Sequence, residues 1–243
     1  MTTQFSIRAA AVALLCLAPI PHVAAYDLFY CNETAIRWPG TAPVQLRAGQ
    51  VSFPAGVWRD GLQQSVDRWN QSPSQFRYTL SFNDPSTALD NGQNEVWFST
   101  DDAILDGAPA IAYFWWSCID YWIFGTGAEM KETDVIFNTG VTFSPDMTDK
   151  TQLWEYGGDF RPFQTTAIHE LGHGLGLGHE DDTFNVMGQD WSHLHVNGNV
   201  ARPYVGEDAA NGAVKLYGLR SPKIEDLSVS HWRFDSPDDD GEY

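Results

Sequence analysis

The stretch "TTAIHELGHGLGLGHEDDTFNVMG", from Thr165 to Gly188, holds three of the chain's seven histidines. His169 and His173 are four residues apart, so on a helix their side chains project from the same face. Gly176 can take a positive φ at low cost, and a sharp turn there returns His179 toward the first two histidines. Three neutral imidazoles plus a water molecule predict a tetrahedral zinc ion with one exchangeable position, which is the arrangement of catalytic zinc.

Glu170 follows the first of these histidines directly. In this place it can hold a metal-bound water as general base without being a ligand itself. The pattern HExxH is weak evidence alone, but the third histidine and the glycine at the bend make the string specific. The competing interpretation is three surface or core histidines on a glycine-rich turn. The four glycines from Gly172 to Gly178 would weaken a purely structural helix, so that interpretation explains the composition badly.

This string resembles the signature HExxHxxGxxH of the metzincin metallopeptidases. The matching residues are His169, Glu170, His173, Gly176 and His179. A second mark of the family is a methionine in a tight turn beneath the metal, and Met187 in "FNVMG" matches it. The alternative for Met187 is an ordinary buried methionine.

Within the metzincins, "QTTAIHELGHGLGLGHEDD" and "EDAANGAVKLYG" are most similar to the active helix and the closing helix of matrixin-type domains. The likeness covers roughly residues 35–219. It implies a secreted zinc metalloendopeptidase that cleaves proteins or peptides. It also places an edge strand at Ala110, Ile111 and Ala112, where a substrate could add as a further strand. A core role for this aromatic strand is the alternative.

Two other functions stay open at this stage. One is a zinc-binding secreted protein without proteolytic activity, and the other is a structural protein whose histidines bind no metal. The chain also departs from matrixins, because the only histidine before His169 is His22, so a second, structural zinc is not expected. Gln189 stands where astacin-like and serralysin-like relatives carry a tyrosine, which argues against those branches.

Residues 1–25 have the pattern of a signal peptide, with one basic residue, an apolar run and the small residues Val23-Ala24-Ala25. The run is too short for a membrane span, so an exported protein is expected, extracellular or periplasmic if the source is bacterial. Cys31 and Cys118 remain after the signal peptide is cleaved, and in an oxidising compartment the simplest expectation is that they form a disulfide. The alternative is a latency role for Cys31 as a zinc ligand.

The formal net charge of −18 argues against nucleic-acid and anionic-membrane partners. Acidity also makes Ca²⁺ a candidate second cofactor at Asp101-Asp102, Asp181-Asp182 or Asp106-Gly107, although solvated acidic turns are the simpler interpretation. His193 and His195 are expected at the rim of the site or elsewhere on the surface, and not among the ligands. The mature chain suits one monomeric domain.

The expected fold class is α+β of the zincin or metzincin type: a twisted mixed sheet with an N-terminal, an active-site and a C-terminal helix. The domain is placed at 26–220, followed by an acidic tail at 221–243 that composition marks as disordered or as a stub leading out of the domain. Thr165 or Thr166 is the expected N-cap of the active-site helix. The expected helices are 56–73, 160–176 and 207–218; the expected strands lie within 35–49, 75–82, 94–100, 108–125 and 132–140, with an acidic loop at 101–107.

Overall fold

The computed structural model of the chain describes residues 26–121, 125–180, 185–188 and 194–220, apart from the side chains at 119–126. The predicted signal peptide at 1–25, the pair Asp181-Asp182, Gln189, His193 and the tail at 221–243 lie outside the described residues.

The core of the fold is a five-stranded mixed sheet of order β4-β3-β5-β7-β6. β3 is parallel to both β4 and β5, β5 is parallel to β7, and β6 runs antiparallel to β7 at the edge of the sheet. The strands are β3 Val44–Gly49, β4 Tyr78–Asp84, β5 Asn94–Ser99, β6 Ala110–Tyr121 and β7 Gly125–Asn138. The expected α+β class and mixed sheet are therefore confirmed. Within the segment 108–125, residues 110–121 form one long strand, β6, and β7 begins at Gly125.

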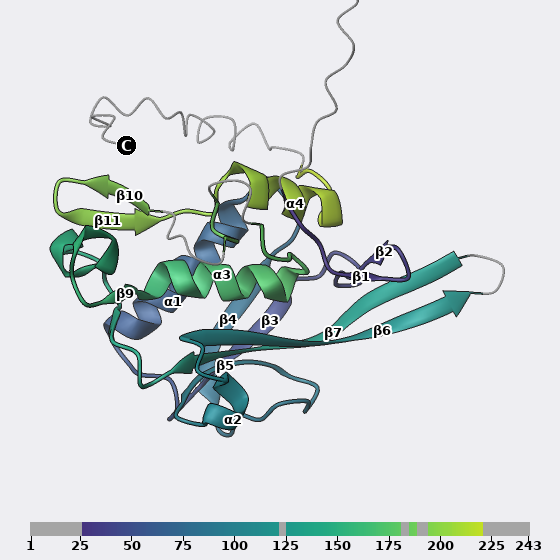
Figure 1. Ribbon diagram of the computed structural model, residues 1–243. Helices are drawn as coiled ribbons and strands as arrows, with labels where there is room; N and C mark the ends of the chain where they lie inside the picture. Colours follow the sequence, from purple (N-terminus) through teal and green to yellow (C-terminus); the bar gives the residue numbers. More distant parts are fainter. Residues whose placement is uncertain (1–25, 122–124, 181–184, 189–193, 221–243) are drawn as a thin grey trace, which may run out of the picture.

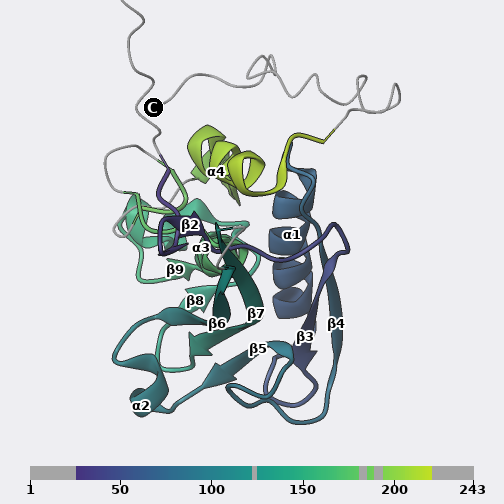
Figure 2. The ribbon, with the colours of Figure 1, turned by 90° about the vertical axis from the view of Figure 1, so that its right-hand side faces the viewer.

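Two helices, α1 (Val57–Gln71) and α3 (Phe163–Leu175), lie on one face of the sheet, and α4 (Glu207–Tyr217) lies beside them (Figures 1 and 2). All three coincide closely with the expected helices. The acidic loop at 101–107 contains a single helical turn, α2 (Asp102–Leu105), whose N-cap is the side chain of Asp101. No helix among the described residues is long and apolar enough to cross a membrane.

The predicted N-cap of the active-site helix is wrong, because α3 begins at Phe163 and its N-cap is Pro162. The Thr166 hydroxyl donates to the Pro162 carbonyl at 3.1 Å, so Thr166 lies within the first turns. Phe163 is fully buried and packs against Phe137 with ring centroids 4.9 Å apart. This core contact, together with the pairing of Pro162 in a short strand, starts the helix earlier than capping preference predicts.

Shorter elements surround this body. They are the hairpin β1 (Tyr30–Cys31) and β2 (Thr34–Ala35), the pair β8 (Phe143–Ser144) and β9 (Arg161–Pro162), the hairpin β10 (Leu194–Asn197) and β11 (Val200–Pro203), and the 3-10 turns η1 (Lys150–Gln152) and η2 (Trp154–Tyr156). Cys31 and Cys118 lie at disulfide distance with Cα atoms 6.0 Å apart, as the cysteine count predicts. This bridge ties β1 to β6.

Candidate metal centre

The three histidines of the motif converge on one point at the C-terminal half of α3 and the loop after it. The Nε2 atoms of His169, His173 and His179 lie 3.1 Å from one another along all three sides of a triangle. Ligands about 2.0–2.1 Å from a tetrahedral zinc ion are separated by about 3.3 Å, so this triangle is close to the required size. It is the only group of three or more metal-binding side chains within reach of one ion in the described part of the chain.

Hydrogen bonds at the Nδ1 atoms of His169 and His173 determine which ring nitrogen carries the proton. His169 Nδ1 lies 2.7 Å from the Val186 carbonyl oxygen, and His173 Nδ1 lies 2.8 Å from the Leu177 carbonyl oxygen. A carbonyl can only accept, so each Nδ1 donates and each Nε2 presents a lone pair. Two lone pairs 3.1 Å apart repel each other unless a cation lies between them. These three histidines could therefore hold a metal ion, whose identity the ligand set alone does not fix.

Burial keeps the imidazole of His173 in the neutral form that a metal ligand needs. His173 is 8% exposed, and burial holds its pKa well below the usual value, with the neighbouring His169 and His179 adding to the effect. His169 is half-buried and His179 is exposed, so the metal position opens to solvent on the His179 side.

The return of His179 depends on the turn at Gly176. Gly176 has a φ of 103° and ends α3 as its C-cap, a conformation that glycine adopts without strain. A Cβ there would collide with the Ile36 carbonyl oxygen. The N-terminal segment braces the turn: Phe29 N–H donates to the Gly176 carbonyl at 3.1 Å, and Gly178 N–H donates to the Asp27 carbonyl at 2.9 Å.

Side chains from distant elements anchor α3 through its backbone carbonyls. Trp69 of α1 donates to the Ile168 carbonyl at 2.9 Å, Tyr78 of β4 to the Leu171 carbonyl at 2.9 Å, and Trp38 to the Gly174 carbonyl at 2.7 Å. Polar atoms of aromatic residues thus fix the position of the helix that carries two histidines. Sequence reasoning assigned Trp69 to the apolar face of its helix and missed this polar role, for which a hydrophobic pattern gives no signal.

Glu170 is buried beside the histidine triangle at 7% exposure. Burial raises its pKa to about 8, and the positive charge of Arg161 and a hydrogen bond from the Ala112 backbone N–H oppose the rise. The bond from Ala112 also joins the carboxylate to edge strand β6. The structure thus gives Glu170 a buried carboxyl group that is in contact with edge strand β6.

Met187 lies in a turn beneath the histidines. Its backbone N–H donates to the Asn185 side-chain oxygen at 2.6 Å, and Gly188 N–H donates to the Asn185 carbonyl at 3.2 Å. Met187 is 2% exposed, and its sulfur fills the space where a side chain at Gly172 would lie. The same turn supplies the Val186 carbonyl that orients His169. Met187 is thus a buried residue of a turn that packs against α3 at Gly172.

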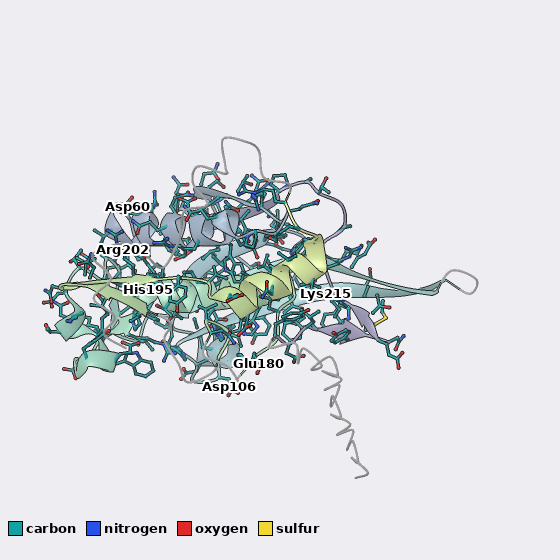
Figure 3. The ribbon with its side chains drawn as sticks, turned by 90° about the horizontal axis from the view of Figure 1, so that it is seen from above. Asp60, Asp106, Glu180, His195, Arg202 and Lys215 are labelled. Atoms are coloured by element: carbon teal, nitrogen blue, oxygen red, sulfur yellow. A yellow bond between two sulfur atoms is a disulfide. The ribbon has the colours of Figure 1, made fainter. Side chains whose placement is uncertain are left out.

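The other candidate residues take different positions. Ala110, Ile111 and Ala112 begin β6 at the open edge of the sheet. His195 lies in β10, is exposed, packs on Tyr204 with ring centroids 4.0 Å apart and is not part of the triangle; Figure 3 labels it. Asp101, Asp102 and Asp106 are exposed around α2, and no carboxylate trio among the described residues is close enough to share an ion.

A buried acidic cluster in the sheet was not predicted. Asp84, Glu95, Glu132 and Asp134 are each at most 3% exposed. Burial raises the pKa of Glu95 to about 7 and that of Asp134 to about 8. Glu132 accepts from the backbone of Asn91 at 2.9 Å and of Gly92 at 2.6 Å. All four residues lie in strands, Asp84 in β4, Glu95 in β5, and Glu132 and Asp134 in β7, so no local sequence pattern shows that their carboxyl groups meet.

Comparison with known proteins identifies no family for this chain. A scan against protein-family models finds no match, and a search of curated protein sequences finds none either. The candidate site therefore stands on its motif and its geometry.

Proposed function

We propose that the protein is a secreted zinc-dependent endopeptidase of the metzincin type that hydrolyses peptide bonds in proteins. The observation that carries the proposal is the pair of Nε2 lone pairs, on His169 and His173, fixed toward one point by carbonyl acceptors behind each ring. His179 completes the triangle, and the buried Glu170 adds a base. The resemblance of the motif to metzincins supports the choice of zinc and of a peptide substrate.

Each residue has a distinct task in this function. His169, His173 and His179 would hold the ion, which when bound makes water acidic and polarises a carbonyl group. Glu170 accepts the proton of the attacking water and later donates it to the departing amine. The positive charge of the ion would favour the carboxylate form of Glu170, against the effect of burial on its pKa. The edge strand around Ala112 would hold the substrate backbone.

Metal content tests the site itself. Purified protein is expected to contain about one zinc ion per chain and to lose thermal stability when a chelator removes it, because ligand binding stabilises the folded state. His169→Ala is expected to abolish binding, and His195→Ala, outside the triangle, to leave the content unchanged. A zinc content of zero in the wild type, measured by atomic emission, would refute the metal site.

Peptide cleavage tests the enzyme. Replacing Glu170 with glutamine keeps the shape and removes the base, so the rate is expected to fall about 10²–10⁴-fold with zinc still bound. The exposed Glu207, on α4, provides the matched control Glu207→Gln. Equal cleavage by wild type and Glu170→Gln would reject the assigned role. No cleavage by a zinc-loaded wild type across a peptide library would favour a zinc-binding protein without proteolytic activity.

A further inference from the structure

A pocket of about 390 Å³ lies between α1, the loop of residues 145–148 and strand β11. It also reaches Gln164 near the start of α3, but neither the three histidines of the triangle nor Glu170 line it. The pocket is therefore separate from the candidate metal centre. Its volume lies in the range of about 300–1,000 Å³ that is usual for small-molecule sites.

One wall of the pocket is a face of α1 that carries opposite charges at its two ends. Asp60, Gln64 and Arg68 all line the pocket. Because they follow one another at intervals of four residues, they form a row along one side of the helix. Eight residues separate Asp60 from Arg68, which corresponds to about 12 Å along the helix axis. The pocket thus has an acidic end and a basic end.

The loop opposite α1 adds a second carboxylate at the acidic end. Asp146 lines the pocket next to Pro145, and a Cβ at Gly61 would lie 2.9 Å from the Pro145 carbonyl oxygen. This loop therefore packs directly on α1 beside Asp60. Asp60 and Asp146 are both exposed, and no lysine or arginine of the described residues lies within 4.0 Å of either carboxylate. The acidic end can therefore accept a cation.

The hairpin strand β11 adds a second guanidinium group at the basic end. Burial lowers the pKa of Arg68, and the positive charge of Arg202 on β11 lowers it further, while Asp67 opposes the change. The two guanidinium groups are thus close enough to repel each other. In the part of the chain that the structure describes, neither has a carboxylate within 4.0 Å. Guanidinium groups bind carboxylates with paired hydrogen bonds, so this end suits an anion.

Uncharged polar groups lie between the two ends. Gln64, Thr148 and Gln164 line the pocket, and their amide and hydroxyl groups can both donate to and accept from the amides of a peptide. An extended chain spans about 3.3–3.6 Å per residue, so three residues cover about 10–11 Å. This length is close to the separation of Asp60 and Arg68 along α1. A tripeptide would therefore place its ammonium group at one end and its carboxylate at the other.

We propose that this pocket binds short peptides of about three residues with both ends free. The ammonium group lies at Asp60 and Asp146, and the carboxylate group lies at Arg68 and Arg202. A single amino acid is too short to reach both ends, and a long chain carries its charged ends too far apart. This inference goes beyond the proposed function and does not depend on it, because the pocket shares no residue with the metal centre.

Calorimetric titration with trialanine tests the pocket. The Glu170→Gln variant is used with its metal content unchanged, so that cleavage cannot consume the probe. Trialanine is expected to bind at one site per chain. N-acetyl-trialanine lacks the ammonium group and trialanine amide lacks the carboxylate. Each should bind about tenfold more weakly, because a hydrogen bond between charged groups is lost.

Substitutions in the same background should remove the preference for one free end at a time. In Arg202→Gln, trialanine and its amide should bind equally, while acetylation still weakens binding. In Asp60→Asn the opposite pattern is expected. Figure 3 labels both residues together with Lys215 on α4 and Asp106 at the end of α2, which are also exposed. Lys215→Gln and Asp106→Asn are therefore the matched controls and should keep both preferences.

The titrations separate this pocket from the proposed function. If trialanine does not bind, the pocket is not a peptide site. If the preference for free ends is unchanged in both Arg202→Gln and Asp60→Asn, the peptide is held elsewhere and the inference is overturned. A protein that binds trialanine with the expected pattern, but whose wild type cleaves no peptide, would defeat the proposed function and leave the pocket supported.

Discussion

His169 Nδ1 donates a hydrogen bond of 2.7 Å to the carbonyl oxygen of Val186, the residue that precedes Met187. Residues 17 positions apart are thereby joined, so the turn that contains Met187 fixes the tautomer of His169, the first candidate metal ligand. The turn is thus a support for the ligand set as well as a packing element beneath it.

Substitution of Met187 should show how much its packing under α3 stabilises the protein. Met187→Ala is expected to destabilise the protein by about 2–5 kcal/mol, because a buried side chain under α3 is lost. Met187→Leu keeps most of the volume and should cost about 1.5 kcal/mol or less. Urea unfolding of the zinc-loaded variants measures both. Equal stability of the alanine and leucine variants would contradict a packing role.

Gly176 should be far more sensitive to substitution than glycines elsewhere. Gly176→Ala places a side chain at a φ of 103° and against the Ile36 carbonyl, so it combines backbone strain with a collision. The strain alone costs about 1–3 kcal/mol. Gly157→Ala, at a φ of 86° with no neighbour within 4 Å, is the control for strain without collision. In urea unfolding, Gly176→Ala should lose more stability than Gly157→Ala. It should also bind zinc more weakly, because the turn at Gly176 positions His179. Equal losses of stability in the two variants would argue against a tight turn.

Removal of the disulfide should loosen the brace around the metal centre. The bridge spans 87 residues of sequence, and losing it is expected to cost about 2–5 kcal/mol. The Cys31→Ser/Cys118→Ser variant should show a lower Tm than the wild type by calorimetry. A reducing agent should lower the wild-type Tm and leave that of the variant unchanged. A wild type that does not respond to reduction would show that the bridge does not form in solution.

The buried acidic cluster is expected to make the free energy of unfolding fall as pH rises. In the folded protein the pKa of Glu95 is raised to about 7 and that of Asp134 to about 8, chiefly by burial. Both groups therefore keep a proton that the unfolded chain loses near about pH 4. Their contribution is fully present below that pH and is lost as pH rises toward 8.

Asp134→Asn should flatten this dependence, since an amide does not ionise. Urea unfolding between about pH 5 and 8.5 in calcium-free buffer measures the slope. Asp102→Asn, at an exposed position in α2, should retain the wild-type slope. The same slope in Asp134→Asn as in the wild type would mean that Asp134 does not hold the proton.

Sequence reasoning alone predicted the three histidines as candidate metal ligands, the carboxyl group of Glu170 as a candidate base, the bend at Gly176 and the main helices. These features depend on spacing within one segment, where helical periodicity and the freedom of Gly176 act locally. The tertiary structure decided the rest, because the deciding contacts join residues far apart in the chain. Only it starts α3 at Phe163 rather than at a threonine, sets the proton on His169 through Val186, and brings Asp84, Glu95, Glu132 and Asp134 together. It also aligns Phe29 with Phe114, since core packing, strand pairing and a disulfide bring distant segments into contact and leave no periodic trace in sequence.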